Sequence, residues 1–211
     1  MENKVTIIDY GMGNLWSVVS AIKFLGADPV VSHDPIEIAN SNCLVLPGVG
    51  SFRRAMETIK TNKYDQAIVE ALTNSKTKLL GICLGMQLLG GSSTEDGVTP
   101  GLGLVPNLVT RFSSNNDIKI KVPHIGFSEV KSPKNSSLFA NIPDNSCFYF
   151  VHSYFMEIAN FDVTMSHVAI ATHGTDFVAA IESGRICGTQ FHPEKSQKSG
   201  LKLLQNFLER F

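Results

Sequence analysis

The sequence is poor in cysteine, and its cysteines form no pattern. The 211 residues contain only four, which are far apart and include no Cys-x-x-Cys pair: Cys43, Cys83, Cys147 and Cys187. Disulfide frameworks and structural zinc sites need more closely spaced sulfur ligands. The histidines show no ligand spacing such as His-Glu-x-x-His either. We therefore expect free thiols, with Cys43, Cys147 and Cys187 in the core, and neither a metal nor another cofactor.

Charge of one sign and long apolar runs are also missing. The formal net charge is −1 and only 18% of the residues are charged. The chain thus lacks the basic excess that nucleic acid or an anionic membrane surface would attract. No apolar stretch approaches the length of a membrane span, and the apolar run within residues 1–11 is too short for a signal peptide. These absences predict a cytoplasmic protein whose partner is neither nucleic acid nor membrane.

Short apolar runs that alternate with helical periods characterise the first half of the chain. Strands are predicted at 5–10, 29–32, 43–46 and 79–82, and helices at 15–25, 52–61 and 64–75. Strands that alternate with helices indicate a mostly parallel sheet covered by helices on both faces. No Pro-, Gly- or Ser-rich linker divides the sequence, so we expect a single domain over residues 1–211.

The second half consists mainly of strand-like segments joined by turns. They lie at 104–112, 126–130, 147–151, 168–172, 177–182 and 185–191, with Ser183-Gly184 as one turn. A last helix is predicted from about Ser199, with Leu201, Leu204, Leu208 and Phe211 on its apolar face. The expected fold class is α/β: an open, mostly parallel central sheet with helices on both faces and antiparallel hairpins added in the C-terminal half.

Cys83 lies where an apolar strand runs directly into a helix, between Gly81 and Gly85. This pattern is the cysteine form of the nucleophile elbow, a strained turn that pushes its side chain out at the carboxyl edge of the sheet. The flanking glycines let backbone and substrate approach closely. The helix N-terminus favours a thiolate and offers N–H groups to an oxyanion. The alternative is a buried structural cysteine, the usual fate of a free thiol.

His192 and Glu194 follow another predicted strand, in the segment Phe-His-Pro-Glu. In extended backbone, residues two apart point to the same side, so the carboxylate can orient the imidazole. Pro193 fixes its own φ and discourages a helix that would separate them. A lone His-x-Glu pair is more often a surface ion pair. Together with the elbow, however, it predicts a base for Cys83 and a group that orients this base.

Three further segments lie at the ends of predicted strands. Residues 46–52 contain glycines that expose backbone N–H groups, which suits a developing oxyanion, although alone they would be an ordinary strand–helix turn. They lack the Gly-Lys-Ser/Thr ending of a phosphate loop. Residues 11–14 resemble the start of a dinucleotide fingerprint, but Trp16 stands where its third glycine belongs. His152, near the end of residues 149–154, is either a second base or a hydrogen-bonded structural residue.

Five segments, in their order along the chain, closely resemble the class I (triad) glutamine amidotransferases. They are PGVGSF, GICLGMQLL, VPHIGF, YFVHSY and GTQFHPEKS. The resemblance spans almost the whole chain, and the elbow and FHPE segments are highly specific for this family. PGVG and VPHIG narrow the resemblance to the glutaminase subunits of imidazole glycerol phosphate synthases, which are enzymes of histidine biosynthesis. Many other relatives have a Gly-Gly-Pro type of loop in place of PGVG.

The resemblance implies a glutaminase in which Cys83 attacks the side-chain carbonyl of L-glutamine. His192 would be the general base and acid, and Glu194 would orient it. The other implied site groups are the backbone N–H groups of Val49 and Leu84 for the oxyanion, and Gly50, Gln87, His152, Ser153 and Tyr154 for glutamine. Ammonia would pass to a cyclase subunit of (β/α)8 type in a heterodimer. The family's interface corresponds to residues 11–14 and to the segment near Gly126.

The chain departs from the family at Phe127 and Ser128, where Trp and Asn are usual. Because both positions lie near the partner, one alternative is a paralogous subunit that supplies ammonia for amidino groups on bacterial surface sugars. From other classes, an inactive or regulatory binding module on the same fold and a peptide-cleaving cysteine hydrolase are alternatives. The complete triad argues against the module, and the match to a glutamine pocket argues against the peptidase.

Overall fold

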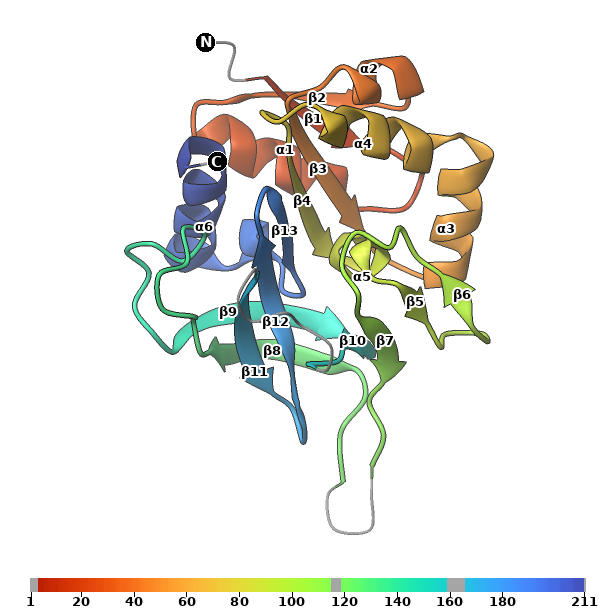
Figure 1. Cartoon of the computed structure of the whole chain (residues 1–211). Helices are drawn as coiled ribbons and strands as arrows, with labels where there is room; N and C mark the ends of the chain where they lie inside the picture. Colours follow the sequence, from red (N-terminus) through yellow and green to blue (C-terminus); the bar gives the residue numbers. More distant parts are fainter. Residues whose placement is uncertain (1–3, 115–118, 159–165, 211) are drawn as a thin grey trace.

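A seven-stranded sheet forms the centre of the computed structural model, which describes residues 4–114, 119–158 and 166–210. Its strand order is β11-β12-β13-β4-β3-β1-β2 (Figure 1). The strands are β1 (Lys4–Ile8), β2 (Asp28–Ser32), β3 (Cys43–Gly48), β4 (Lys78–Cys83), β11 (Ser166–Thr172), β12 (Asp176–Ser183) and β13 (Ile186–Thr189). Five neighbouring strands, β2, β1, β3, β4 and β13, are parallel to one another. β12 and β11 add an antiparallel hairpin at the β13 edge. The predicted fold class is confirmed.

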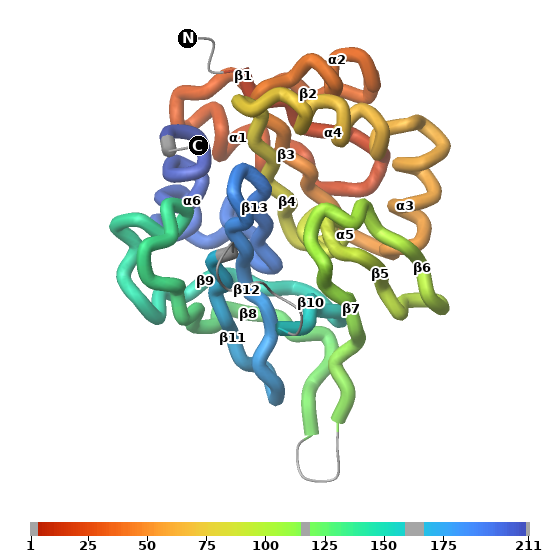
Figure 2. Tube along the Cα trace, viewed as in Figure 1, coloured from red at the N-terminus to blue at the C-terminus, as the bar shows by residue number. Residues whose placement is uncertain are grey.

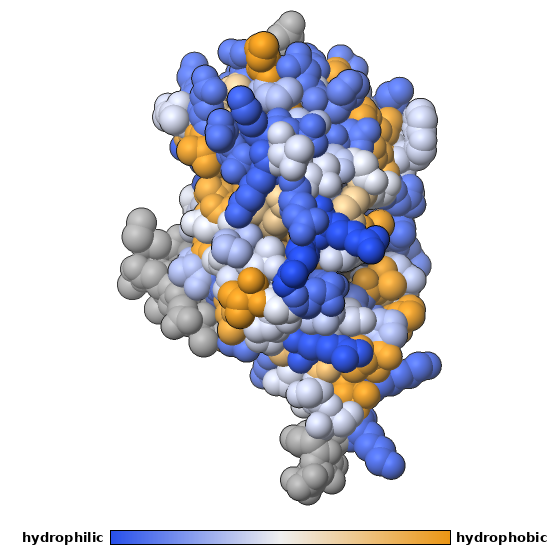
Figure 3. All heavy atoms as spheres, turned by 90° about the vertical axis from the view of Figure 1, so that its right-hand side faces the viewer, coloured by the Kyte–Doolittle hydropathy of each residue, from blue (hydrophilic) through white to orange (hydrophobic). Residues whose placement is uncertain are grey.

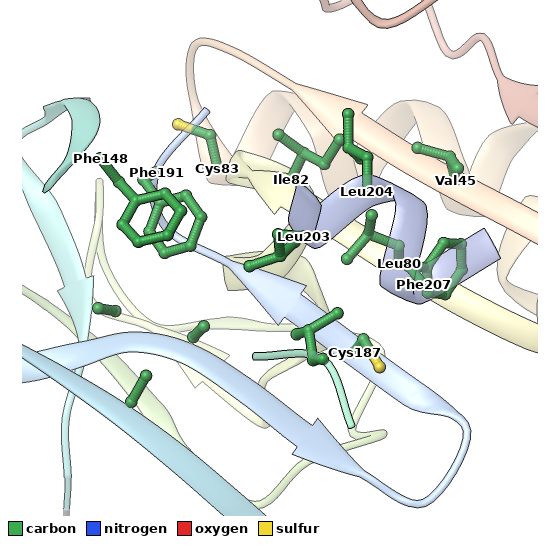
Figure 4. Close-up of a cluster of buried hydrophobic side chains, with 14 of the residues drawn as sticks. Val45, Leu80, Ile82, Cys83, Phe148, Cys187, Phe191, Leu203, Leu204 and Phe207 are labelled. Atoms are coloured by element: carbon green, nitrogen blue, oxygen red, sulfur yellow. The ribbon is translucent and has the colours of Figure 1, made fainter. Parts of the chain in front are cut away.

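Helices cover both faces of this sheet because its strands are apolar on both sides. On one face lie α1 (Leu15–Phe24) and α6 (Gln197–Arg210), and on the other α2 (Pro35–Ala39), α3 (Phe52–Thr61), α4 (Tyr64–Thr73) and α5 (Leu84–Leu89). Val45, Leu80 and Ile82 project from the sheet toward Leu204 and Phe207 of α6 (Figure 4). The last helix begins two residues earlier than predicted, and Phe211 lies outside the described residues.

The outer layer follows from helical spacing of apolar residues. In α3, Phe52, Ala55, Met56 and Ile59 are buried, while Ser51 caps the helix by accepting the Arg54 N–H at 3.4 Å. The face of the molecule that carries α3 and β6 (Thr99–Pro100) is mainly hydrophilic, with scattered apolar side chains (Figure 3). The five-residue helix α2 was not predicted, because it is too short to show a helical period.

The remaining strands form two smaller sheets. β8 (His124–Val130) pairs with β9 (Ser146–His152), and the other sheet has the order β10 (Tyr154–Met156), β7 (Leu108–Arg111), β5 (Ser92–Ser93) and β6. β8 lies beside β11, with a bridge between Lys131 and Ile170 (Figure 2). The prediction that all the later hairpins extend the central sheet is therefore wrong for these two. The strand predicted at 104–112 is also shorter, because the N–H groups of Leu104 and Val105 bind the carbonyl of Leu89.

The carboxyl ends of three neighbouring parallel strands meet at one edge of the central sheet. In the register, Gly48 of β3 pairs with Cys83 of β4, and Thr189 of β13 pairs with Ile82. The segments that leave these ends therefore start side by side, although they are far apart in the sequence. This edge is where open α/β sheets bind their ligands.

Candidate active site

Cys83 ends β4 and directly precedes α5, with φ +54° and ψ −111°. A positive φ is uncommon for a residue with a side chain and is typical of strained functional positions. A Cβ on Gly81 would come within 2.8 Å of the Gly85 backbone, and a Cβ on Gly85 would overlap the carbonyl of Leu46. The tight packing of strand, helix and neighbouring strand thus requires both glycines. The geometry is that of a nucleophile elbow.

His192 and Glu194 form a buried pair at the same edge. His192 Nδ1 lies 2.8 Å from Glu194 Oε1, and both side chains are almost fully buried. The main chain holds the imidazole in place, because the His192 N–H donates to the Tyr149 carbonyl at 2.9 Å and Ser196 Oγ donates to the His192 carbonyl at 2.6 Å. Glu194 lies in the 3-10 turn η1 (Pro193–Lys195) rather than in an extended segment. The predicted pairing is nevertheless present.

The second nitrogen of His192 is the reactive one. Nε2 is buried and has no hydrogen-bond partner in the part of the chain that the structure describes. Burial lowers the pKa of His192, but the neighbouring Cys83 and the Glu194 carboxylate outweigh it and raise the pKa to about 10. A protonated imidazole is therefore favoured beside the sulfur. Such a group can give its proton to a leaving amine and later take one from water.

His152 belongs to a chain of hydrogen bonds whose direction can be deduced. Its Nδ1 lies 2.8 Å from the carbonyl of Tyr154, so it must donate there. In the neutral ring, Nε2 then accepts from His124 Nδ1 at 3.0 Å, and His124 Nε2 in turn accepts from Ser128 Oγ at 2.9 Å. Both ring nitrogens of His152 are occupied. The geometry favours the hydrogen-bonded structural role over the second base.

Burial keeps both of these histidines neutral. It lowers the pKa of His124 to about 4, with the nearby His173 as a second cause, and it lowers the pKa of His152 to about 3. The neighbouring His124, His173 and His192 add to the effect on His152, and the Tyr154 carbonyl opposes it. The neutral state is the one that the deduced hydrogen-bond direction requires. His152 therefore holds the start of β10, which carries Tyr154, against β8.

This arrangement predicts that the fold loses stability in mild acid. His152 has a folded pKa below its unfolded value, so the unfolded chain binds more protons as the pH falls below about 6.5. The free energy of unfolding should then drop by up to about 1.4 kcal/mol per pH unit from this group. Urea unfolding of the parent and of His152→Gln between pH 7 and 4.5 measures the difference. Equal slopes for the two proteins would contradict a neutral, buried His152.

Gln87, one of the residues expected to bind glutamine, is connected to Cys83 through Gln190. Gln87 is buried, and its amide donates to the Tyr154 carbonyl at 2.8 Å and to Gln190 Oε1 at 2.9 Å. Gln190 in turn donates to Cys83 Sγ at 3.8 Å, which links the elbow to β10. The sequence analysis did not single out Gln190. The available signal was a polar residue at the end of a buried strand, two positions before His192.

The groups expected to hold the oxyanion and glutamine lie around the same edge. Leu84 is the first residue of α5, and Val49 follows Gly48, which pairs with Cys83. Val49 is 42% exposed, Gly50 is also exposed, and Ser153 and Tyr154 are half-buried. Val49, Gly50, Ser153 and Tyr154 therefore keep surface that a substrate could meet. Within the described residues, no group of three or more His, Cys, Asp or Glu side chains could hold a metal.

The sheet with its elbow and buried His–Glu pair defines a class of protein, the class I glutamine amidotransferases. The family model described as "Glutamine amidotransferase class-I" matches residues 6–211, and the chain belongs to this family. It is 45% identical to the imidazole glycerol phosphate synthase subunit HisH of Chlorobium chlorochromatii, over 97% of this chain and 99% of that protein. It is 43% identical to subunit HisH 1 of Parasynechococcus marenigrum, over 98% and 97%. Within the family, the chain belongs with the HisH subunits.

Solved structures agree on the fold. A crystal structure titled as a glutamine amidotransferase superposes with a TM-score of 0.73 over 97% of both chains, at 16% identity. PurLQS from Thermotoga maritima also gives a TM-score of 0.73, over 100% of this chain and 99% of that one, at 18% identity. Among the described residues, no helix is long and apolar enough to cross a membrane.

Proposed function

We propose that the chain is the glutaminase subunit of an imidazole glycerol phosphate synthase in histidine biosynthesis. It hydrolyses L-glutamine to glutamate and ammonia and delivers the ammonia to a cyclase subunit. The observation that carries the proposal is the buried His192–Glu194 pair, at 2.8 Å, with its unoccupied Nε2 beside the elbow cysteine. It occurs in a chain that is 41–45% identical to HisH subunits along almost its whole length.

The groups of the site suffice for a thioester mechanism. Cys83 Sγ attacks the side-chain carbonyl carbon of glutamine after its proton has passed to His192, and the N–H groups of Val49 and Leu84 stabilise the oxyanion. His192 then protonates the departing nitrogen, which leaves as ammonia. A water molecule gives a proton to His192 and attacks the thioester. Glutamate leaves, and the thiol recovers its proton. Glu194 orients His192 throughout, as its 2.8 Å contact with Nδ1 allows.

A partner of (β/α)8 cyclase type would use the ammonia in a heterodimer. Exposed apolar side chains support such a docking face near the site. Trp16 and Phe24 of α1 are 79% and 76% exposed, and they border a groove that reaches Glu194. Ile125 and Phe127 of β8 are exposed as well. We place the heterodimer in the cytoplasm, where the substrates of such a biosynthetic enzyme are made.

The isolated chain should be a poor glutaminase that its partner switches on. Residues 47–50 have glycines on both sides of Val49, and Gly50 has φ +108°, so the Val49 peptide can take more than one orientation. Only one orientation aims its N–H at the oxyanion, and one such donor is worth about 10²–10³ in rate. Glutamate release should therefore rise by at least about that factor, mostly in kcat, when the cyclase subunit and its nucleotide-like substrate are added. Full activity of the isolated chain would contradict the switch.

The same assay distinguishes the other candidates. The Phe127–Ser128 departure favours the paralogue that serves amidino-sugar synthesis as second candidate, because these residues lie on β8 and Phe127 is 50% exposed. Cyclase-type subunits of both pathways should be tested, and the one that stimulates identifies the pathway. A regulatory module would release no glutamate with either subunit. Peptide substrates serve as controls, and their cleavage in preference to glutamine would indicate a peptidase.

A further inference from the structure

The hydroxyl of Tyr10 is a buried polar group without a hydrogen-bond partner in the described part of the chain. Tyr10 follows β1 and is only 4% exposed, within the apolar cluster that also holds α3, α4 and α5. Most buried hydroxyl groups in proteins are hydrogen-bonded, because an unused donor in the interior is destabilising. The mechanism above does not use this group. Its isolation therefore points to a state of the protein in which it is bonded.

The hydroxyl lies directly against Gly48 in residues 47–50, the oxyanion loop, which carries the Val49 N–H proposed to bind the oxyanion. A Cβ on Gly48 would overlap the Tyr10 oxygen and would come within 3.2 Å of the Leu84 side chain. Gly48 thus has to be glycine, and it lies between Tyr10 and the first residue of α5. Burial raises the pKa of Tyr10 well above its ordinary value, and the charge of Cys83 raises it further. The phenol therefore keeps its proton and remains a donor.

We infer that Tyr10 is a positioning residue that donates to the Gly48 carbonyl when the loop holds its active orientation. The inference rests on the proposed function. A planar trans peptide points its N–H and its carbonyl in opposite directions. Glutamine reaches Cys83 from the solvent side, where Val49 is exposed, whereas Tyr10 lies on the buried side. Turning the Val49 N–H toward the substrate therefore turns the Gly48 carbonyl toward the hydroxyl.

The isolation of the hydroxyl makes this contact selective for one state. In the present structure it forms no bond with any described residue, so the new bond stabilises only the active orientation. Removing the hydroxyl should therefore destabilise the active orientation. It takes no hydrogen bond away from the orientation in the present structure, which we call the resting orientation. A structural tyrosine would behave in the opposite way, because its hydroxyl is already bonded in the resting fold.

Tyr10→Phe tests the inference, with glutamate release and urea unfolding measured on the same protein. We expect kcat of the isolated chain to fall about tenfold, the usual worth of a hydrogen bond made in only one of two states, with KM for glutamine unchanged. The unfolding midpoint should stay the same or rise, because an unused buried donor is removed. A kcat within twofold of the parent would overturn the inference. So would a loss of activity that follows a loss of stability.

Tyr64→Phe is the matched control. Tyr64 is 5% exposed, and its hydroxyl already donates to the His33 carbonyl at 3.0 Å. This variant should lower the unfolding midpoint and leave kcat unchanged, which is the reverse of Tyr10→Phe. The same result for both tyrosines would overturn the selective role of Tyr10. A parent chain that releases no glutamate, either alone or with the cyclase subunit and its substrate, would overturn the proposed function together with the inference, whereas equal turnover of parent and Tyr10→Phe would overturn the inference alone.

Discussion

Replacing Cys83 with alanine should abolish glutamine hydrolysis while leaving the fold and partner binding intact. Cys83 supplies the nucleophile that attacks glutamine in the proposed mechanism, and without it no thioester can form. The strain of the turn lies in the backbone, which the glycines at 81 and 85 accommodate. Among the described residues the sulfur makes long contacts, at 3.8 Å to the Gln190 amide and 4.0 Å to the Val151 carbonyl. Little packing is therefore lost. Residual activity within tenfold of the parent would eliminate Cys83 as the nucleophile.

The partner provides the control for this variant. With Cys83→Ala in the complex, the cyclase reaction should still proceed on added ammonium salts, because only the source of ammonia has been removed. Loss of the ammonium-dependent reaction would mean that the substitution damages the assembly instead of the chemistry.

Chemical labelling gives a second check on Cys83. A thiol-directed glutamine analogue should modify Cys83 and spare Cys43 and Cys187. All three are buried, but Cys83 lies beside the base His192, whereas burial raises the pKa of the other two thiols. Cys147 is exposed, so the expectation that it lies in the core is wrong. The alternation along β9 explains this, since Phe148 and Phe150 point inward and Cys147 points outward. Cys147 consequently reports the non-specific reaction, which a simple alkylating reagent should show and the glutamine analogue should not.

The sequence predicted the strands and helices that local patterns define. The continuous apolar runs of β1, β3 and β4, and the helical periods of α1, α3 and α4, all lie close to the predicted bounds. Sheet membership in the second half was less predictable, since strand pairing depends on contacts between distant segments. β8 and β9 resemble any other hairpin strands in sequence, yet in the described part of the chain they form a separate two-stranded sheet.

The site shows the same division between local and distant information. Short motifs with their own geometry identified the elbow and the His–Glu pair. The links between motifs were not predictable, because Gln190 reaches Cys83 across 107 positions and His124 reaches His152 across 28. A single sequence also gives no sign that the Tyr10 hydroxyl ends beneath residues 47–50. That placement depends on the β1–β3 pairing and on the packing of α5.

Loss of the imidazole should be nearly as damaging as loss of the thiol. His192→Ala removes the group that takes the proton from Cys83, protonates the leaving nitrogen and activates water. General acid–base groups contribute about 10²–10⁴-fold to the rate, so kcat should fall by at least about 10²-fold. Steady-state glutamate release and the amplitude of thioester formation should decrease together. A variant that retained more than about a hundredth of the parent rate would show that another group moves these protons.

Glu194→Gln separates orientation from charge in the same pair. The amide oxygen can still accept from His192 Nδ1, so the loss in kcat should be smaller than for His192→Ala. The negative charge disappears, however, and it is one of the causes that raise the pKa of His192. The pKa should therefore fall from about 10, and the alkaline limb of the pH–rate profile should move to lower pH, because the acid that protonates ammonia loses its proton earlier. An unchanged alkaline limb would mean that His192 does not set it, and a loss equal to that of His192→Ala would mean that Glu194 does more than orient the ring.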